Sequence, residues 1–238
     1  MFESVSLSSD MTIEVLSIGR EHQPVVVLDQ VLANPENLLS FAAGGDAFSA
    51  TPNDYYPGVR KELPKQYSDL LCQLILEKFP EIFGVSSDSQ ARVNLCALSM
   101  ATTPAEDLRP IQSLPHFDTC HNSQLAVVHY LCSESHGGTS FFRHRNTGFE
   151  AITEGRIQRY APALKAEVMG TRFLGQQYVN GDNEWFERTG GVGAKFNRAI
   201  FYRGNMLHSG DVRPEMGLSP EPEAGRLTAN AFIQLESF

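Results

Sequence analysis

The sequence predicts an α+β fold, in which a β-barrel or β-sandwich is backed by helices from the N-terminal part of the chain. Two observations predict it. Apolar residues recur at helical spacing in the first third of the sequence, whereas strand-like segments rich in Val, Leu and Phe follow from residue 90 onward, with long insertions between them. Helices first and strands afterwards are typical of an α+β domain.

Residues 1–89 are expected to form one strand and two helices. The apolar, β-branched run 24–28 predicts the strand. A helix capped by Asn34 should follow and end at the glycines 44–45, because Asn is a preferred N-cap and the proline after it a preferred first helical residue. After the turn-rich segment 46–64, helical spacing of apolar residues predicts a helix over 67–79, directly before a proline.

The rest of the chain is expected to form the β core. The predicted strands are 91–98, 124–132, 139–142, 198–203 and 226–234, with one helix near 157–169. We take residues 1–238 as one domain, because all-β folds often reach this length. Residues 1–89 then support a core over 90–238. That core holds an insertion near 149–190, either a lid over a substrate or a packed insertion.

Charge and composition disfavour several classes of protein. Lys and Arg number 19 and Asp and Glu 28, and the formal net charge of −9 disfavours nucleic acid and anionic membranes as partners. No stretch approaches the roughly 20 apolar residues of a membrane span. The first ten residues lack the pattern of a secretory signal, and the four cysteines form no Cys-x-x-Cys pair. We therefore expect a cytoplasmic protein, of unknown oligomeric state.

A His-x-Asp motif, His116 and Asp118, is the first candidate for chemistry. In an extended segment residues i and i+2 point to the same side, so the imidazole and the carboxylate converge. His208, after the predicted strand 198–203, offers a third ligand. Two histidines and one carboxylate on one face leave open positions on iron(II), as in non-haem oxygenases. On the motif alone, the alternative is a histidine hydrogen-bonded to its neighbouring aspartate.

The residues after the motif carry a resemblance. Tyr130-Leu131 ends a strand, a short loop follows, and then come Gly137-Gly138, Thr139 and Phe141. This order resembles 2-oxoglutarate/Fe(II)-dependent oxygenases of the prolyl-4-hydroxylase-like kind, over roughly residues 90–235. The resemblance implies a double-stranded β-helix, the jelly-roll core of cupin-like proteins. It also implies iron(II) bound by the two histidines and Asp118, with 2-oxoglutarate as co-substrate.

The resemblance also implies a basic residue on the last strand that binds the distal carboxylate of 2-oxoglutarate. Arg226 fits, because a guanidinium pairs with a carboxylate through two parallel hydrogen bonds. Thr228, two residues later, could add a hydroxyl. Arg213 is a competing candidate on a proline-bearing loop. Arg226 lies 18 residues after His208, an unusually long separation that a loop insertion over 217–225 would explain.

Several further residues have a functional and a structural interpretation. Tyr130 and Asn94 either line the oxo-acid pocket or fill and flank the barrel. Tyr55, Tyr56 and Arg60 either form one wall of a substrate site or belong to a surface loop.

Four other residues near the motifs receive lesser roles. Arg143 and Trp185 are weaker candidates for the substrate wall, whereas His121 and His129 are expected to be structural.

The expected activity is hydroxylation, with O₂, of a small molecule or of a peptide or protein side chain. Two alternatives stay open. One is a cupin-like metalloenzyme that does not use 2-oxoglutarate. The other is a non-catalytic binding module that keeps the three ligands as a structural metal site.

Overall fold

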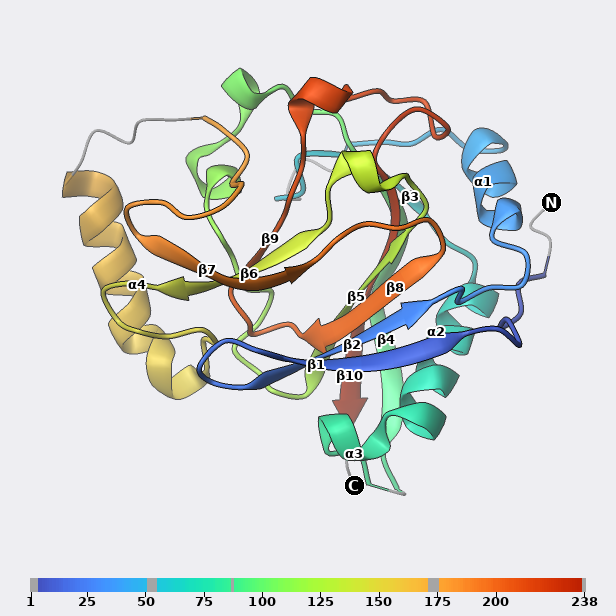
Figure 1. Ribbon diagram of the computed structural model, residues 1–238, viewed down its shortest axis with the longest axis horizontal. Helices are drawn as coiled ribbons and strands as arrows, with labels where there is room; N and C mark the ends of the chain where they lie inside the picture. Colours follow the sequence, from blue (N-terminus) through green and yellow to red (C-terminus); the bar gives the residue numbers. More distant parts are fainter. Residues whose placement is uncertain (1–3, 51–54, 87, 171–175, 237–238) are drawn as a thin grey trace.

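The computed structural model describes residues 4–50, 55–86, 88–170 and 176–236, which form two facing antiparallel sheets with helices on their outer sides (Figure 1). The larger sheet has the order β1-β2-β8-β5-β10-β4-β3 and the smaller one the order β7-β6-β9. Strands that are distant in sequence therefore alternate within each sheet. This is the double-stranded β-helix, or jelly roll, and the predicted fold class is confirmed.

The strands have the following bounds. Those of the larger sheet are β1 (Thr12–Ile18), β2 (Gln23–Asp29), β3 (Gly58–Glu62), β4 (Gln90–Ala101), β5 (Gln124–Tyr130), β8 (Arg198–Arg203) and β10 (Leu227–Glu236). Those of the smaller sheet are β6 (Thr139–His144), β7 (Phe186–Val192) and β9 (His208–Gly210).

Four α-helices and four short 3₁₀ turns complete the described chain. The helices are α1 (Glu36–Ala43), α2 (Lys65–Lys78), α3 (Pro80–Phe83) and α4 (Glu154–Gly170). The turns are η1 (Ala105–Asp107), η2 (Pro110–Ser113), η3 (Glu134–His136) and η4 (Pro214–Met216). α1 to α3 cover the outer face of the larger sheet, while α4 packs beside the smaller one (Figure 1).

The apolar core of the larger sheet follows from strand alternation. On β10, Leu227, Ala229 and Ala231 are buried together with α2 residues such as Leu71 and Ile75. The residues between them, Thr228 and Asn230 among them, face the interior between the two sheets. One face of β10 therefore stabilises the fold, and the other is available for a site.

The Gly-Gly turn before β6 is required by close backbone packing. Gly137 has φ +78°, and a Cβ there would overlap the carbonyl oxygen of Asp211, whereas a Cβ at Gly138 would overlap that of Val192. Only glycine fits at both positions. The two glycines let β6 start directly against β7 and β9.

Several local expectations differ from the structure. α1 starts at Glu36 with Pro35 as N-cap, and no side chain caps it, so the predicted cap by Asn34 is wrong. Buried Lys61 instead donates to the carbonyls of Phe41 and Gly44 at the other end of this helix. The turn-rich segment contains β3, and residues 186–190 belong to β7 rather than to an insertion.

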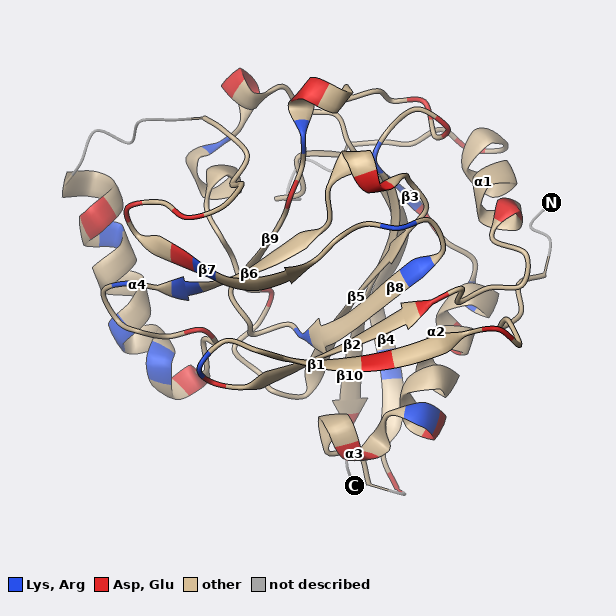
Figure 2. Cartoon of the chain, in the orientation of Figure 1, with Lys and Arg blue, Asp and Glu red and all other residues tan. Residues whose placement is uncertain are grey.

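No helix within the described ranges is long and apolar enough to cross a membrane. Acidic and basic side chains are interspersed along α4, as Figure 2 shows. The division of the chain into one domain stays a prediction, although β1, β2 and β3 from its first part pair within the same sheet as the later strands.

A buried polar chain links α2 to the larger sheet. The Tyr67 hydroxyl lies 2.9 Å from Nδ1 of His129, whose Nε2 lies 3.1 Å from Oδ1 of Asn197. Asn197 exchanges two further hydrogen bonds with the Leu32 backbone. The tyrosine therefore donates to Nδ1, and Nε2–H donates to the amide. Burial lowers the pKa of His129 to about 4, which favours this neutral form.

Replacement of Tyr67 by Phe should destabilise the protein by about 1–2 kcal/mol, because Nδ1 of the buried His129 loses its donor. Urea unfolding at pH 7 measures the change. The exposed ion pair of Lys65 with Asp69 provides a control, and Lys65→Ala should change stability by less than about 0.5 kcal/mol. Equal stability of Tyr67→Phe and wild type would contradict the proposed donor role.

The lowered pKa of Asp29 predicts that the stability of the protein depends on pH in the acidic range. Hydrogen bonds from Arg198, opposed by burial, lower its pKa from 3.8 to about 2, with a smaller contribution from Lys195. Because the folded pKa is the lower one, the stabilisation is complete above about pH 4 and lost as the pH falls towards 2. Asp29→Asn should cost roughly 1 kcal/mol at pH 7, after allowance for solvent screening. The difference from wild type should shrink between pH 4 and pH 2 in urea unfolding; a constant difference would contradict the linkage.

Candidate metal centre

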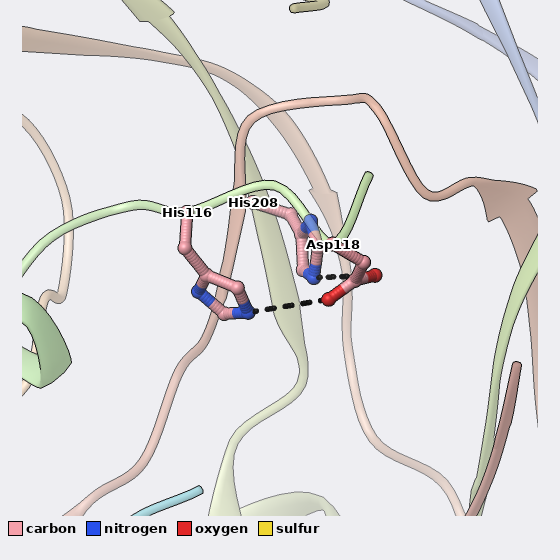
Figure 3. Close-up of side chains that lie close together, drawn as sticks. All are labelled: His116, Asp118 and His208. Atoms are coloured by element: carbon pink, nitrogen blue, oxygen red, sulfur yellow. Dashed lines mark ion pairs between the residues drawn. The ribbon is translucent and has the colours of Figure 1, made fainter. Parts of the chain in front are cut away.

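The side chains of His116, Asp118 and His208 point toward one another (Figure 3); Asp118 and His208 are largely buried, and His116 is half-exposed. Nε2 of His116 lies 3.8 Å from Oδ1 of Asp118, and Nε2 of His208 lies 3.7 Å from Oδ2. The three candidate ligand atoms lie within 4.8 Å of one another. Cis ligands of an octahedral ion bound at 2.0–2.1 Å lie about 3 Å apart, so a modest closure of the side chains would complete the site.

Backbone hydrogen bonds bring the motif to β9. The amide of His116 donates to the carbonyl of His208 at 2.9 Å, and the amide of His208 donates back at 2.8 Å. The amide of Asp118 donates to Gly204 at 2.7 Å. The segment is thus held extended on both sides of Phe117, and the two side chains point the same way, as expected.

His208 is oriented by its second ring nitrogen. Nδ1 lies 2.8 Å from the carbonyl of Met206, so Nδ1–H donates and Nε2 keeps its lone pair. The ring of Tyr202 packs edge-on against the imidazole, with 4.9 Å between ring centres. A histidine fixed in this tautomer presents a ready ligand atom to the cluster.

The electrostatics of the cluster suit a cation. Burial lowers the pKa of His208 to about 4 and raises the pKa of Asp118 to about 6, against the lowering effect of His116 and Arg60. Burial and His208 lower the pKa of His116 as well. Half of the His116 side chain is exposed, however, so burial weighs more on His208, whose side chain is 6% exposed. The imidazoles are therefore neutral, and a buried carboxylate faces them.

Asp118 provides the fit test for a metal. Its Oδ2 is buried and has no hydrogen-bond partner among the described residues. Buried carboxylate oxygens are normally hydrogen-bonded, ion-paired or bound to a metal. The donor set of two imidazole nitrogens and one carboxylate suits iron(II) and related divalent ions.

Arg226 lies close to the cluster in the interior. The residue is 6% exposed, Nη2 donates to the carbonyl of Gly138 at 2.8 Å, and Nε has no partner among the described residues. Nη2 also lies 3.4 Å from where a Cβ would stand on Gly210. Gly210 follows His208 by two residues on the same side of β9, a step of about 6.6 Å.

Further polar groups line the same interior. Thr228 pairs with Ser99 on one side and with Tyr130 on the other, and the Tyr130 hydroxyl is 2.7 Å from Oγ1 of Thr139. Oγ of Ser99 and Oδ1 of Asn230 are buried without a hydrogen-bond partner in the described part of the chain. Such groups normally find partners, so this interior fits a polar ligand.

Tyr56 and Arg60 lie at the edge of this interior. The guanidinium carbon of Arg60 stands 4.7 Å from the centre of the Tyr56 ring. Burial raises the pKa of Tyr56, against the lowering effects of Arg226, Arg60 and the Thr228 hydroxyl. Arg60 also lowers the pKa of Asp118. Both residues therefore lie within electrostatic reach of the candidate site.

Other predicted residues are placed elsewhere. Tyr55 is 64% exposed, and Arg109 stacks on it. Asn94 lies at the exposed end of β4, with its amide 3.5 Å from Gln124, so its prediction as a pocket residue is wrong. Arg143 pairs with the buried Glu150 at 3.7 Å, and its role as a wall residue stays a prediction.

Arg213 and Trp185 are the two remaining candidates. Arg213 is exposed at the start of η4, which favours Arg226 as the guanidinium of the site. Trp185 borders a surface hollow of about 510 Å³ beside α4, together with Arg145, Asn146, Ala166, Glu167, Gly170 and Glu184.

Sequence reasoning missed Ser99, Asn230 and Tyr202. The alternation of β10 carried the necessary signal for Asn230, because it continues the series Arg226, Thr228 at steps of two. Ser99 and Tyr202 became visible only through strand pairing, which places Ser99 beside Thr228 and Tyr202 beside Ala126.

These features define a double-stranded β-helix protein in which two histidines and one carboxylate cluster near a buried arginine. The chain belongs to DUF6445, a family of unknown function whose sequence profile matches residues 9–233. No curated protein matches the sequence.

Similar folds occur among solved structures. HygX from Streptomyces hygroscopicus with nickel and 2-oxoglutarate bound is 12% identical, over 90% of this chain and 84% of that one, with a TM-score of 0.49. The non-heme alpha ketoglutarate dependent epimerase SnoN from nogalamycin biosynthesis is 14% identical, over 90% and 79%, with a TM-score of 0.47. Because identities and TM-scores are this low, any function has to be argued from the residues of this chain.

The three-residue cluster should bind a divalent cation. Nickel(II) at about 100 times its Kd should raise the free energy of unfolding by about 2.7 kcal/mol. His208→Ala should remove this effect, because it deletes the most buried ligand. His121→Ala is the control: His121 lies three residues after Asp118 in the same loop as that ligand, is mostly exposed and pairs with Glu154, so the nickel effect should persist. An unchanged nickel effect in His208→Ala would contradict the site.

Proposed function

We propose that this protein is a non-haem iron(II) oxygenase that uses 2-oxoglutarate and O₂. His116, Asp118 and His208 hold the iron, and Arg226 with Thr228 binds the distal carboxylate of 2-oxoglutarate. The reaction is hydroxylation of a small molecule or of a peptide or protein side chain. One observation supports the proposal best. The buried guanidinium of Arg226 lies beside Gly210, two residues after His208 on β9, and therefore close to the three-residue cluster.

The ligand set supports the metal part of the proposal. Two neutral imidazoles and one carboxylate leave three positions of an octahedral iron open, enough for a bidentate oxo-acid and for O₂. Bound iron(II) and 2-oxoglutarate together supply O₂ activation, with release of succinate and CO₂. In the oxygenases that the sequence resembles, halogenating members lack the carboxylate ligand, and Asp118 therefore argues against halogenation.

The polar interior supports the co-substrate part. A dicarboxylate brings negative charge into a buried space, which requires a positive partner and hydrogen-bond donors. Arg226 supplies the guanidinium with a free Nε–H, and the hydroxyl of Thr228 lies on the same side of β10. Tyr130 lies beside this guanidinium, with 6.0 Å between its ring centre and the guanidinium carbon, and Arg226 is only 6% exposed. Tyr130 is thus a positioning residue of the co-substrate pocket.

The surroundings of the cluster support an orienting role for the protein. Met206 fixes the tautomer of His208, and Tyr202 packs against its ring. The exposed side of His116 is where a primary substrate would approach, and Tyr56 and Arg60 border the same interior.

The four cysteines are free thiols, which supports the proposal of a cytoplasmic location.

Arg226→Ala should raise the KM for 2-oxoglutarate by about 30-fold or more, because a charge-assisted bidentate contact contributes roughly 2 kcal/mol or more. The measurement is succinate formation by the iron(II)-loaded protein as a function of 2-oxoglutarate. Arg213→Ala, at an exposed arginine of the same loop region, should leave the KM unchanged within about twofold.

Two outcomes would reject the proposal. If the iron(II)-loaded wild type releases no succinate with a panel of metabolites and peptides and develops no visible charge-transfer band with 2-oxoglutarate under anaerobic conditions, the co-substrate is wrong. If Arg213→Ala raises the KM and Arg226→Ala does not, the assignment of the carboxylate-binding residue is wrong.

A further inference from the structure

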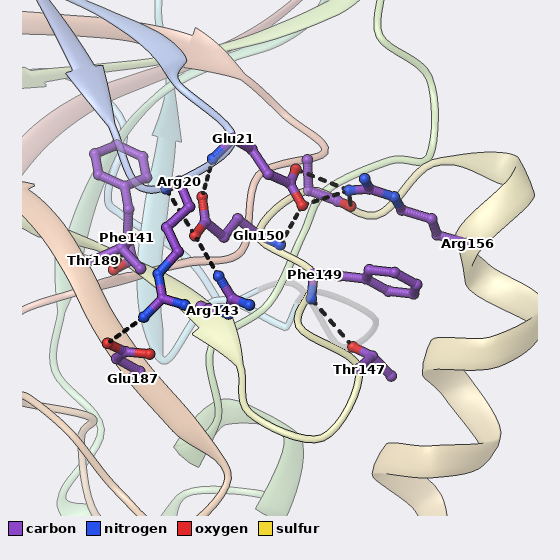
Figure 4. Close-up of polar contacts among 11 residues, drawn as sticks. Arg20, Glu21, Phe141, Arg143, Thr147, Phe149, Glu150, Arg156, Glu187 and Thr189 are labelled. Carbon is purple, nitrogen blue, oxygen red and sulfur yellow. Dashed lines mark hydrogen bonds and ion pairs between the residues drawn. The ribbon is translucent and has the colours of Figure 1, made fainter.

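Glu21 and Glu150, 129 residues apart in the sequence, form a reciprocal pair (Figure 4). The carboxylate of Glu150 accepts hydrogen bonds from the amides of Arg20 at 3.0 Å and Glu21 at 2.9 Å. The carboxylate of Glu21 accepts one from the amide of Glu150 at 3.2 Å. Each carboxylate thus binds the backbone of the other glutamate's segment.

Two arginines close this pair. Nη1 of Arg156, on α4, lies 2.7 and 2.8 Å from the two oxygens of Glu21 and donates to the carbonyl of Ala151 at 2.9 Å. Nη1 of Arg143 lies 3.7 Å from Glu150. Glu150 is only 4% exposed, and removal of its charge would therefore leave Arg143 without its counter-ion and one of the two backbone amides without an acceptor.

The turn between β1 and β2 is built around this carboxylate. Gly19 has φ +69°, and a Cβ there would overlap the carboxyl group of Glu150. A larger residue at 19 is excluded both by its backbone conformation and by the carboxylate. The turn and Glu150 are fitted to each other, which distinguishes this pair from an incidental surface contact.

The segment that follows Glu150 lies against the chain that leads to His208. The carbonyl of Glu150 accepts a hydrogen bond from the amide of Leu207 at 2.8 Å, and the amide of Ile152 donates to Asn205 at 2.8 Å. Ala151 and Met206 form a β-bridge between these contacts. Met206 is the residue whose carbonyl binds Nδ1 of His208.

We propose that the Glu21–Glu150 pair is a positioning device for His208. The two carboxylates and Arg156 fix residues 150–152, these fix residues 205–207, and the carbonyl of Met206 then sets the imidazole towards Asp118. This proposal rests on the proposed metal site but not on 2-oxoglutarate. Neither glutamate touches the metal, so both are positioning residues.

The test compares Glu150→Gln with two controls. Glu150→Gln should raise the nickel(II) Kd about tenfold, the lower end of the effect of removing outer hydrogen-bond partners of metal ligands. Glu187→Gln removes an exposed partner of Arg20 in the same group and should leave the Kd unchanged. Tyr67→Phe destabilises the protein on the far side of the larger sheet and should leave it unchanged too. This second control separates loss of positioning from loss of stability.

Hydrogen exchange of the metal-free protein gives an independent readout. In Glu150→Gln the amides of residues 205–208 should exchange at least tenfold faster, whereas the strand pair β4–β10 should keep its protection. A wild-type exchange rate at 205–208 in this variant overturns the proposal, even if the chain binds no metal. Equal losses of nickel affinity in all three variants also overturn it. A third outcome rejects only the metal site: the wild type binds no nickel, but the amides of residues 205–208 still exchange faster in Glu150→Gln than in the wild type.

Discussion

The candidate site depends on one backbone interaction, the two hydrogen bonds that His116 and His208 exchange. They join an irregular segment after η2 to the first residue of β9, across 92 positions of sequence. Each such bond contributes only about 1 kcal/mol, less than the entropy lost in ordering the residues it joins. The two bonds therefore select the geometry, and the stabilisation comes from other contacts of the same segments. β9 pairs with β6, and the loop before β9 is hydrogen-bonded to Glu150 and Ile152.

The larger sheet separates stability from chemistry by strand alternation. On β10, Leu227 and Ala229 face the helices in a dry core, and Thr228 and Asn230 face the interior between the sheets. Buried polar groups without partners cost about 1–3 kcal/mol each. Ser99, Asn230 and Arg226 each have such a polar atom in the interior. The apolar surface that the opposite face of the same strands buries offsets this cost.

Local pattern predicted much of the fold and the centre of the site. The helix before Pro80, most of the long strands and the convergence of His116 with Asp118 all depend on spacing within a few residues. The three-residue strand β9 and the edge strand β1 carry too little periodicity to be recognised.

The sequence alone could not predict where along a strand each residue lies relative to the site. Asn94 has the expected alternation on β4, but the strand extends to Ala101, and Asn94 lies at its exposed end, far from the row of Ser99 and Thr228. The ion pair of Arg143 with Glu150 was not predicted, because Glu150 is held by the turn at residue 19, more than 120 positions away. Contacts of this kind depend on strand register, which no local pattern encodes.

The exposure of the three candidate ligands gives the site a direction. The His116 side chain is 50% exposed, Asp118 10% and His208 6%, and the guanidinium of Arg226 lies on the buried side, beside Gly210. Under the proposed function, a co-substrate that reaches Arg226 lies inward of the metal. The primary substrate then approaches from the His116 side, where Tyr55 and the loop of η2 are exposed. A co-substrate held inward is shielded from solvent by the two sheets, and only the outward side has to adapt to the substrate. Under the proposed function, changes at Tyr55 and in the η2 loop would therefore alter the approach of the substrate without disturbing the ligand cluster.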